Sequence, residues 1–354
     1  MTPRENVLSI FRRTGYRHAA WNLNLCDFQI AQYKEKTGSL LHYEDYFQLP
    51  LRQALDLAHV APEPEQYMQY YKEPFAPGTV INSWGVAQEP AKNSQYHFFK
   101  VLHPMQSFDS AEQVEHYPLP RLPENIVEIL RKSADDIHAA GNASAGRMSV
   151  TIWETAWFMR GMETLLMDML TESPIAVALL DRLTELSCQR AENYARAGFD
   201  VLHIGDDVST QKSLFMSEAM YCEWLKPRIA KVIAAAKAVN PDILIFYHCC
   251  GFAKPFIKHF IDVGVEILDP VQPESMDFAE IYAEYGSVLS FHGTLGTQTT
   301  LPFGTPKDVK DTVWRNLDIA GEKGGLVVCP THTVEPEVPW ENIVAYIEAC
   351  KTYR

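Results

Sequence analysis

The chain has 354 residues, of which 47% are hydrophobic and 21% charged, and its formal net charge is −14 at pH 7. Proteins that bind nucleic acid need clustered lysine and arginine to neutralise phosphates, so this acidic balance excludes that class. No run of about 18 apolar residues could span a membrane. The first residues lack the apolar stretch of a secretory signal, and the seven scattered cysteines are typical of reduced thiols, so we expect a cytoplasmic protein.

The first 120 residues show no regular hydrophobic period. They are rich in aromatic side chains and carry five prolines between residues 62 and 90. Residues 1–120 are therefore predicted to form an irregular cap of short strands and loops, with a further strand possible at 19–24.

Short apolar strands alternate with helical patterns from about residue 121 onward. The predicted strands are 148–153, 201–205, 243–248, 267–269, 288–292 and 326–329. Spacings of 20–40 residues between them are typical of parallel β/α units.

The helices between these strands have recognisable ends. Ser217 and the pair Thr305–Pro306 are predicted to begin two of them. Glycines at 198, 264 and 321 are predicted to end or follow others. At least six β/α units, each with an apolar strand, favour a closed (β/α)8 barrel over an open doubly wound sheet. No G-x-G-x-x-G follows a strand, which argues against a dinucleotide fold.

Polar side chains follow the predicted strands where each one ends. Because the carboxyl ends of barrel strands share one face, these residues are expected to form a single site. They are Glu154, Asp206, Asp207, His248, Cys250, Gln272, His292, Cys329 and His332. Gln211 follows the adjacent acids and is predicted either to bind substrate or to brace the loop. His203 lies within its strand and is interpreted as a core histidine.

His248 and Cys250 form the most informative pair in this set. Side chains alternate along a strand, so both point to one face, while Cys249 points to the helical layer and is interpreted as structural. An imidazole nitrogen beside a thiolate is a ligand pair that zinc favours. A lone cysteine in a strand is usually a small buried hydrophobe, so the neighbouring histidine is what favours metal binding.

Several motifs resemble the uroporphyrinogen decarboxylase (URO-D) superfamily. They are G-D-D-V-S-T-Q at 205–211, K-P-R at 226–228, G-G-L-V-V at 324–328 and P-W-E-N-I at 339–343. The resemblance runs from about residue 151 to the C-terminus. It implies a single distorted (β/α)8 barrel domain over residues 1–354, with 1–120 as the cap and 121–354 as the regular units.

The superfamily has two branches that differ in their sites. True decarboxylases hold the tetrapyrrole carboxylates with an arginine-rich N-terminal loop. The corresponding segment here, 19–26, contains Asn22 and no arginine. The other branch, cobamide-dependent methyltransferases, carries a zinc site of H-x-C and a distant cysteine, which His248 and Cys250 match. The distant segment reads C-P-T-H, so either Cys329 or His332 is the third ligand.

The resemblance to this branch implies a zinc-dependent methyltransferase. A methyl group would move between a small thiol or methoxy substrate and methylcobamide carried by a corrinoid protein. The candidate catalytic residues are Asp206, Asp207, Glu154 and His332, and the candidate substrate-binding residues are Gln211, His292, Gln272 and Asn22. Asp207 or Glu154 is a candidate fourth zinc ligand. A carboxy-lyase acting on a tetrapyrrole and a non-catalytic binding barrel stay open as alternatives, and homodimerisation is plausible for the superfamily.

Overall fold

The computed structural model describes residues 1–54, 60–90, 99–148 and 150–353. Its main sheet has seven strands in the order β1-β5-β6-β7-β8-β9-β10, and every neighbouring pair is parallel. The strands are β1 Leu51–Gln53, β5 Ala143–Met148, β6 Val201–Gly205, β7 Leu244–His248, β8 Ile267–Asp269, β9 Ser290–His292 and β10 Leu326–Val327.

The segment around residues 21–25 lies beside the residues that follow β10, at one edge of the sheet. Trp21 forms a parallel bridge with Val328 directly after β10, and Leu25 forms another with Val334. A further strand was considered possible at 19–24, and this segment pairs through isolated bridges only. The fold is therefore a distorted (β/α)8 barrel, which confirms the predicted fold class.

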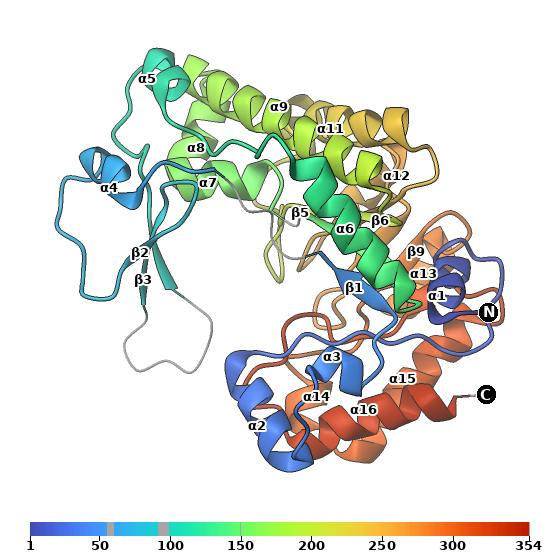
Figure 1. The fold of residues 1–354 in the computed structure, drawn as a ribbon. Helices are drawn as coiled ribbons and strands as arrows, with labels where there is room; N and C mark the ends of the chain where they lie inside the picture. Colours follow the sequence, from blue (N-terminus) through green and yellow to red (C-terminus); the bar gives the residue numbers. More distant parts are fainter. Residues whose placement is uncertain (55–59, 91–98, 149, 354) are drawn as a thin grey trace.

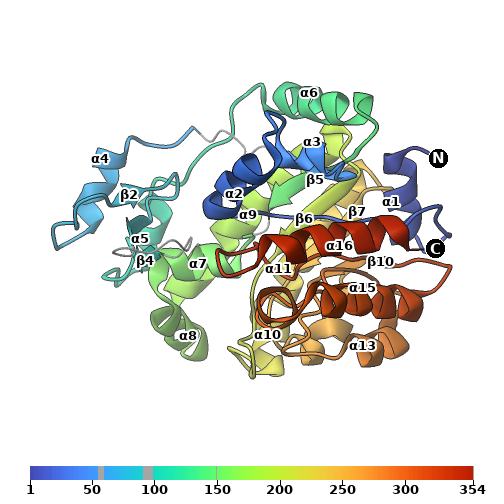
Figure 2. The same cartoon turned by 90° about the horizontal axis from the view of Figure 1, so that it is seen from below.

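Helices connect the strands on the outside of the barrel (Figures 1 and 2). They are α6 Ile126–Ala139, α7 Trp153–Arg160, α8 Met162–Leu170, α9 Pro174–Ala197, α10 Glu218–Trp224, α11 Lys226–Val239, η2 Lys254–Phe256, α12 Ile257–Asp262, α13 Phe278–Tyr285, α14 Thr300–Phe303, α15 Pro306–Ala320 and α16 Trp340–Thr352. The predicted helix starts are confirmed, because Ser217 and Thr305 cap α10 and α15 with their side chains.

Helix α1 (Pro3–Phe11) closes the amino-terminal end of the barrel. Its apolar side chains, such as Ile10 and Phe11, share one buried cluster with Val201, Phe246 and Val327 from the strands. This cluster fills the interior of the barrel at its amino-terminal end, so a cavity can open only at the carboxyl end of the strands.

The predicted strand at 148–153 is wrong in its position. Strand β5 ends at Met148, and Trp153 already begins α7. The first four residues of β5 are small, and at Gly146 the reason is Tyr194 of α9, because a Cβ there would lie 2.4 Å from that ring. Small residues do not form the hydrophobic pattern that predicts a strand, so the strand was predicted at the more apolar residues that follow.

The N-terminal part divides into two regions. Residues 1–54 are more regular than expected and contribute α1, α2 (Asp27–Thr37), α3 (Tyr43–Tyr46) and β1 to the barrel. The following region projects to one side of the barrel in both views (Figures 1 and 2). It contains α4 Pro64–Tyr67, η1 Met68–Tyr70, α5 Ala111–His116 and an antiparallel sheet of β2 Val80–Ile81, β3 Ala87–Pro90 and β4 Phe99–Leu102. Within the described ranges, no helix is both long and apolar enough to cross a membrane.

Candidate metal centre

A cavity of about 440 Å³ opens at the carboxyl ends of the strands. Its size is within the range of small-molecule sites. The predicted site residues that line it are Asn22, Glu154, Asp207, His248, His292, Cys329 and His332, together with His203 and Asp269. The strand ends therefore bring most of the predicted residues to one place.

His248 and Cys250 lie side by side at the end of β7. The Cys250 Sγ is 3.3 Å from Nε2 of His248. Asp207, which follows β6, joins them: its Oδ1 accepts a hydrogen bond from the Cys250 backbone N–H at 2.7 Å and lies 3.9 Å from the His248 Nε2. One ligand atom from each of the three residues lies within 4.8 Å of the others. Nitrogen, sulfur and oxygen donors in one group form a set that suits zinc.

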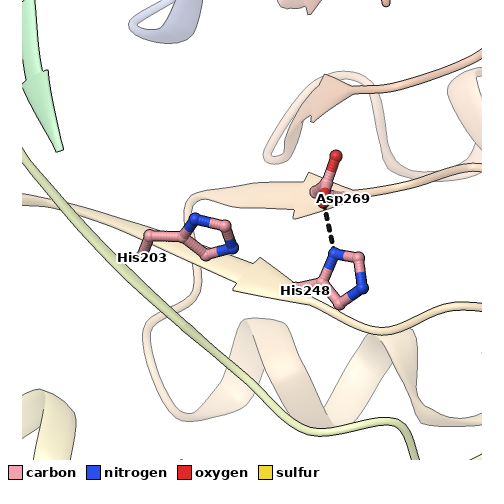
Figure 3. A group of neighbouring side chains, drawn as sticks. All are labelled: His203, His248 and Asp269. Carbon is pink, nitrogen blue, oxygen red and sulfur yellow. Dashed lines mark hydrogen bonds and ion pairs between the residues drawn. The ribbon is translucent and has the colours of Figure 1, made fainter. Parts of the chain in front are cut away.

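Asp269, the last residue of β8, connects two histidines. Its Oδ2 accepts a hydrogen bond from Nδ1 of His248 at 2.5 Å, and its Oδ1 accepts one from Nδ1 of His292 at 2.6 Å (the first is drawn in Figure 3). Burial opposes a charge on this carboxylate, but the two histidines outweigh it and hold the pKa of Asp269 below its ordinary value. Burial also opposes a charged His248, yet Cys250 and Asp269 raise the pKa of this imidazole well above its ordinary value.

Cys329 and His332 occupy different depths. The buried Cys329 Sγ lies 3.3 Å from Nδ1 of His292, and these two residues form a group with Asp269. His332 is exposed at the rim of the cavity. Asn22 also contacts His292: its Nδ2 donates a hydrogen bond to Nε2 of that ring at 3.2 Å. Cys329 thus lies in the inner group, and Asp207 is the third candidate donor beside His248 and Cys250.

The two remaining acids differ in their surroundings. Glu154 lines the cavity, and burial together with Asp207 and Asp206 raises its pKa well above the ordinary value. Asp206 does not line the cavity: its carboxylate accepts hydrogen bonds from the backbone N–H groups of Thr151, Ile152 and Glu154. Burial raises the pKa of Asp206 to about 7, although these hydrogen bonds oppose the rise. Its placement favours an anchoring role at the start of α7 over a catalytic one.

Gln211 and Gln272 hold the loops that follow Asp207 and Cys250. The Gln272 Oε1 accepts from the Gly251 N–H at 3.1 Å, and its Nε2 donates to Oε1 of Gln211 at 2.9 Å. Neither side chain lines the cavity. Of the two roles considered for Gln211, this arrangement favours bracing, and the same holds for Gln272, which was predicted to bind substrate.

Two residues of the site were missed as candidates, Asp269 and His203. Asp269 ends a predicted strand, which is the signal used for its neighbours. His203 shares the strand parity of Asp207 and lines the cavity. Its Nδ1 lies 3.1 Å from the Gln53 Nε2, and burial lowers its pKa to about 3. Its buried Nε2 has no hydrogen-bond partner among the residues that the structure describes.

Comparisons with known proteins agree with this fold. The family model described as uroporphyrinogen decarboxylase (URO-D) matches residues 97–353. No curated protein matches the chain in sequence. A solved structure described as a methyltransferase from Methanosarcina mazei is similar over 99% of this chain and 98% of that one, with a TM-score of 0.70 and 18% identity. A psychrophilic glycoside hydrolase family 10 endo-beta-1,4-xylanase is similar over 62% of this chain and 80% of that one, with a TM-score of 0.41 and 14% identity.

Proposed function

Because the chain belongs to the uroporphyrinogen decarboxylase (URO-D) family, we propose that it is a zinc-dependent methyltransferase of that family. It would move a methyl group between a small thiol or methoxy compound and methylcobamide on a separate corrinoid protein. The observation that carries the proposal is the group of Asp207, His248 and Cys250 beside the cavity. The cavity of about 440 Å³ suits a small substrate better than a tetrapyrrole.

The donor set determines which residues would hold the metal. His248 Nε2, the Cys250 thiolate and an Asp207 oxygen would be the ligands, and Asp269 fixes the ring of His248 through Nδ1. Zinc bound there would supply Lewis acidity, lowering the pKa of a substrate thiol so that it is a nucleophile at neutral pH.

Glu154 is the candidate for moving a proton. Its Oε2 accepts a hydrogen bond from the Asp207 N–H at 3.1 Å, and burial with the neighbouring acids raises its pKa, which favours the protonated carboxyl. A proton on the other oxygen can be donated to an oxygen or sulfur atom of the substrate. His332 and Asn22, which also line the cavity, would contact the substrate.

Two neighbouring cysteines allow a matched test. Cys250→Ser should bind one zinc fewer than wild type and lose methyl transfer from methylcobalamin to a panel of small thiols. Cys249→Ala, in which the buried thiol on the other face of the strand is removed, should keep both. Equal zinc content in Cys250→Ser and wild type would contradict the proposal, and turnover of uroporphyrinogen would favour the decarboxylase alternative.

A further inference from the structure

We propose that the barrel has a second binding position for a zinc-like divalent cation, formed by Asp269, His292 and Cys329 with His203 as a fourth ligand. It lies deeper than the position at His248 and Cys250. All four residues are buried, whereas His248 and Cys250 are only partly buried. The inference goes beyond the proposed function, which needs one zinc.

The first support is the spacing of the donor atoms. One atom each of Asp269, His292 and Cys329 lies within 4.8 Å of the others. The thiol sulfur is 3.3 and 3.4 Å from the two ring nitrogens of His292. Donors around a tetrahedral zinc are roughly 3.3–3.8 Å apart, given its bond lengths. Small side-chain adjustments would therefore bring the three donors onto one ion.

The second support is independent of the first and comes from His203. Its buried Nε2 makes no hydrogen bond to any described residue, and such atoms are rare enough to need an explanation. Figure 3 shows this ring edge turned toward Asp269 and His248, and one donor atom from each of the three lies within 4.8 Å of the others. A cation on Asp269 would provide the missing partner.

The environment of His203 resembles that of a metal-binding histidine. Such a ring usually holds its second nitrogen with an outer hydrogen bond that fixes the ring orientation. Here the Gln53 side-chain amide lies 3.1 Å from Nδ1. Rotation of this amide presents its oxygen to Nδ1–H, which leaves the Nε2 lone pair for a cation.

The two positions use separate ligands. The first uses Nε2 of His248 with Cys250 and Asp207, while Asp269 contacts only Nδ1 of that ring. Nitrogen, oxygen and sulfur donors select zinc over magnesium or calcium. An ion at the inner position would also connect the middle of β6 and the carboxyl ends of β8 and β9 with the residues that follow β10.

The test is a cobalt(II) titration of the full chain, reduced and stripped with a chelator. Each proposed position contains one cysteine, so the absorption from thiolate–cobalt bonds reports each position separately. Wild type should bind two equivalents, Cys250→Ser and Cys329→Ser one each, and the double variant none. Cys350→Ser, which changes a buried cysteine of α16 outside both groups, is the control for folding and should bind two.

His203→Leu extends the test to the fourth ligand. It should weaken binding of the inner equivalent at least tenfold and leave the Cys250-dependent equivalent unchanged. Saturation of wild type at one equivalent would overturn the second position. Loss of that same single equivalent in both cysteine variants would also overturn it, yet would leave the zinc of the proposed function in place. Absence of any cobalt binding would contradict both.

Discussion

Asp269 holds His248 through the nitrogen that faces away from Cys250: its Oδ2 is 2.5 Å from Nδ1 of that ring. In the neutral ring this hydrogen bond keeps the proton on Nδ1 and leaves the lone pair on Nε2, the nitrogen 3.3 Å from the Cys250 sulfur. A carboxylate behind a histidine ligand fixes its tautomer and raises its basicity. The relationship joins a strand-end acid, which the sequence interpretation overlooked, to the H-x-C pair on which that interpretation rests.

Replacing this carboxylate should weaken metal binding at His248 and Cys250. In a Cys329→Ser background, which leaves only that position, Asp269→Asn should lower zinc affinity about 10- to 100-fold. Competition with a chromogenic chelator measures the change. Asp277→Asn is the matched control, because that side chain caps α13 away from the cavity. An unchanged dissociation constant in Asp269→Asn would show that the hydrogen bond has no role in the site.

The loop after Cys250 depends on a glycine for a second reason besides its backbone angle. Gly251 has φ +83°, and a Cβ there would lie 2.3 Å from the carbonyl oxygen of Thr210. Gly264 has φ +100°, but its nearest contact would be an ordinary 3.4 Å. Gly251→Ala should therefore destabilise the fold by about 2 kcal/mol more than Gly264→Ala and weaken zinc binding. Chemical denaturation of both variants measures the difference, and equal losses would contradict the expected clash.

The sequence predicted the barrel best where strands are long or apolar. Strand β6 was predicted with its bounds, and β7 to within one residue, because most of their residues are apolar and buried. Strand β1 was missed, since it has only three residues, Leu51–Gln53, of which two are polar, and it is held as a strand by its tertiary pairing with β5. The family motifs were a better guide than periodicity, and the family they indicated is confirmed.

The candidate site was predictable in its residue types but less so in its grouping. Residues at strand ends converge, as the barrel topology requires. Which of these residues lie close enough to bind one metal ion depends on the paths of the loops. The hydrophobic periodicity of the sequence does not determine those paths. The hydrogen bonds of Asp206 to the α7 backbone and the link between Gln211 and Gln272 both arise from such loops.

The projecting N-terminal region should lose stability at alkaline pH. Tyr67 donates to the carbonyl oxygens of Ser83 and Pro118, and burial raises its pKa to about 12. A pKa raised on folding gives a stabilisation that is complete below the unfolded value of about 10 and is lost as pH rises to 12. Tyr67→Phe has no hydroxyl to titrate, so its free energy of unfolding does not fall for this reason. The difference in unfolding free energy between wild type and Tyr67→Phe should therefore shrink by about 1 kcal/mol between pH 8 and pH 11. A constant deficit in denaturant titrations would contradict the burial of the hydroxyl.

Asp206 provides a test that separates anchoring from catalysis. Its carboxylate accepts three backbone hydrogen bonds at the start of α7. Asp206→Ala leaves these buried donors unpaired, so it should lower the free energy of unfolding by about 3 kcal/mol. Asp206→Asn keeps an accepting oxygen and should cost about 1 kcal/mol. Asp135→Ala, an exposed acid on α6, should change stability by less than about 0.5 kcal/mol.

The asparagine variant decides the role, because it preserves the anchor and removes the acid. If Asp206 only positions the loop that carries Glu154, Asp206→Asn should keep zinc content and lower the rate of methyl transfer less than tenfold. If the variant is as stable as expected but its rate falls by a thousandfold or more, Asp206 takes part in the chemistry despite its place outside the cavity lining. Equal destabilisation by alanine and asparagine would instead show that the charge, and not the accepting oxygen, anchors α7.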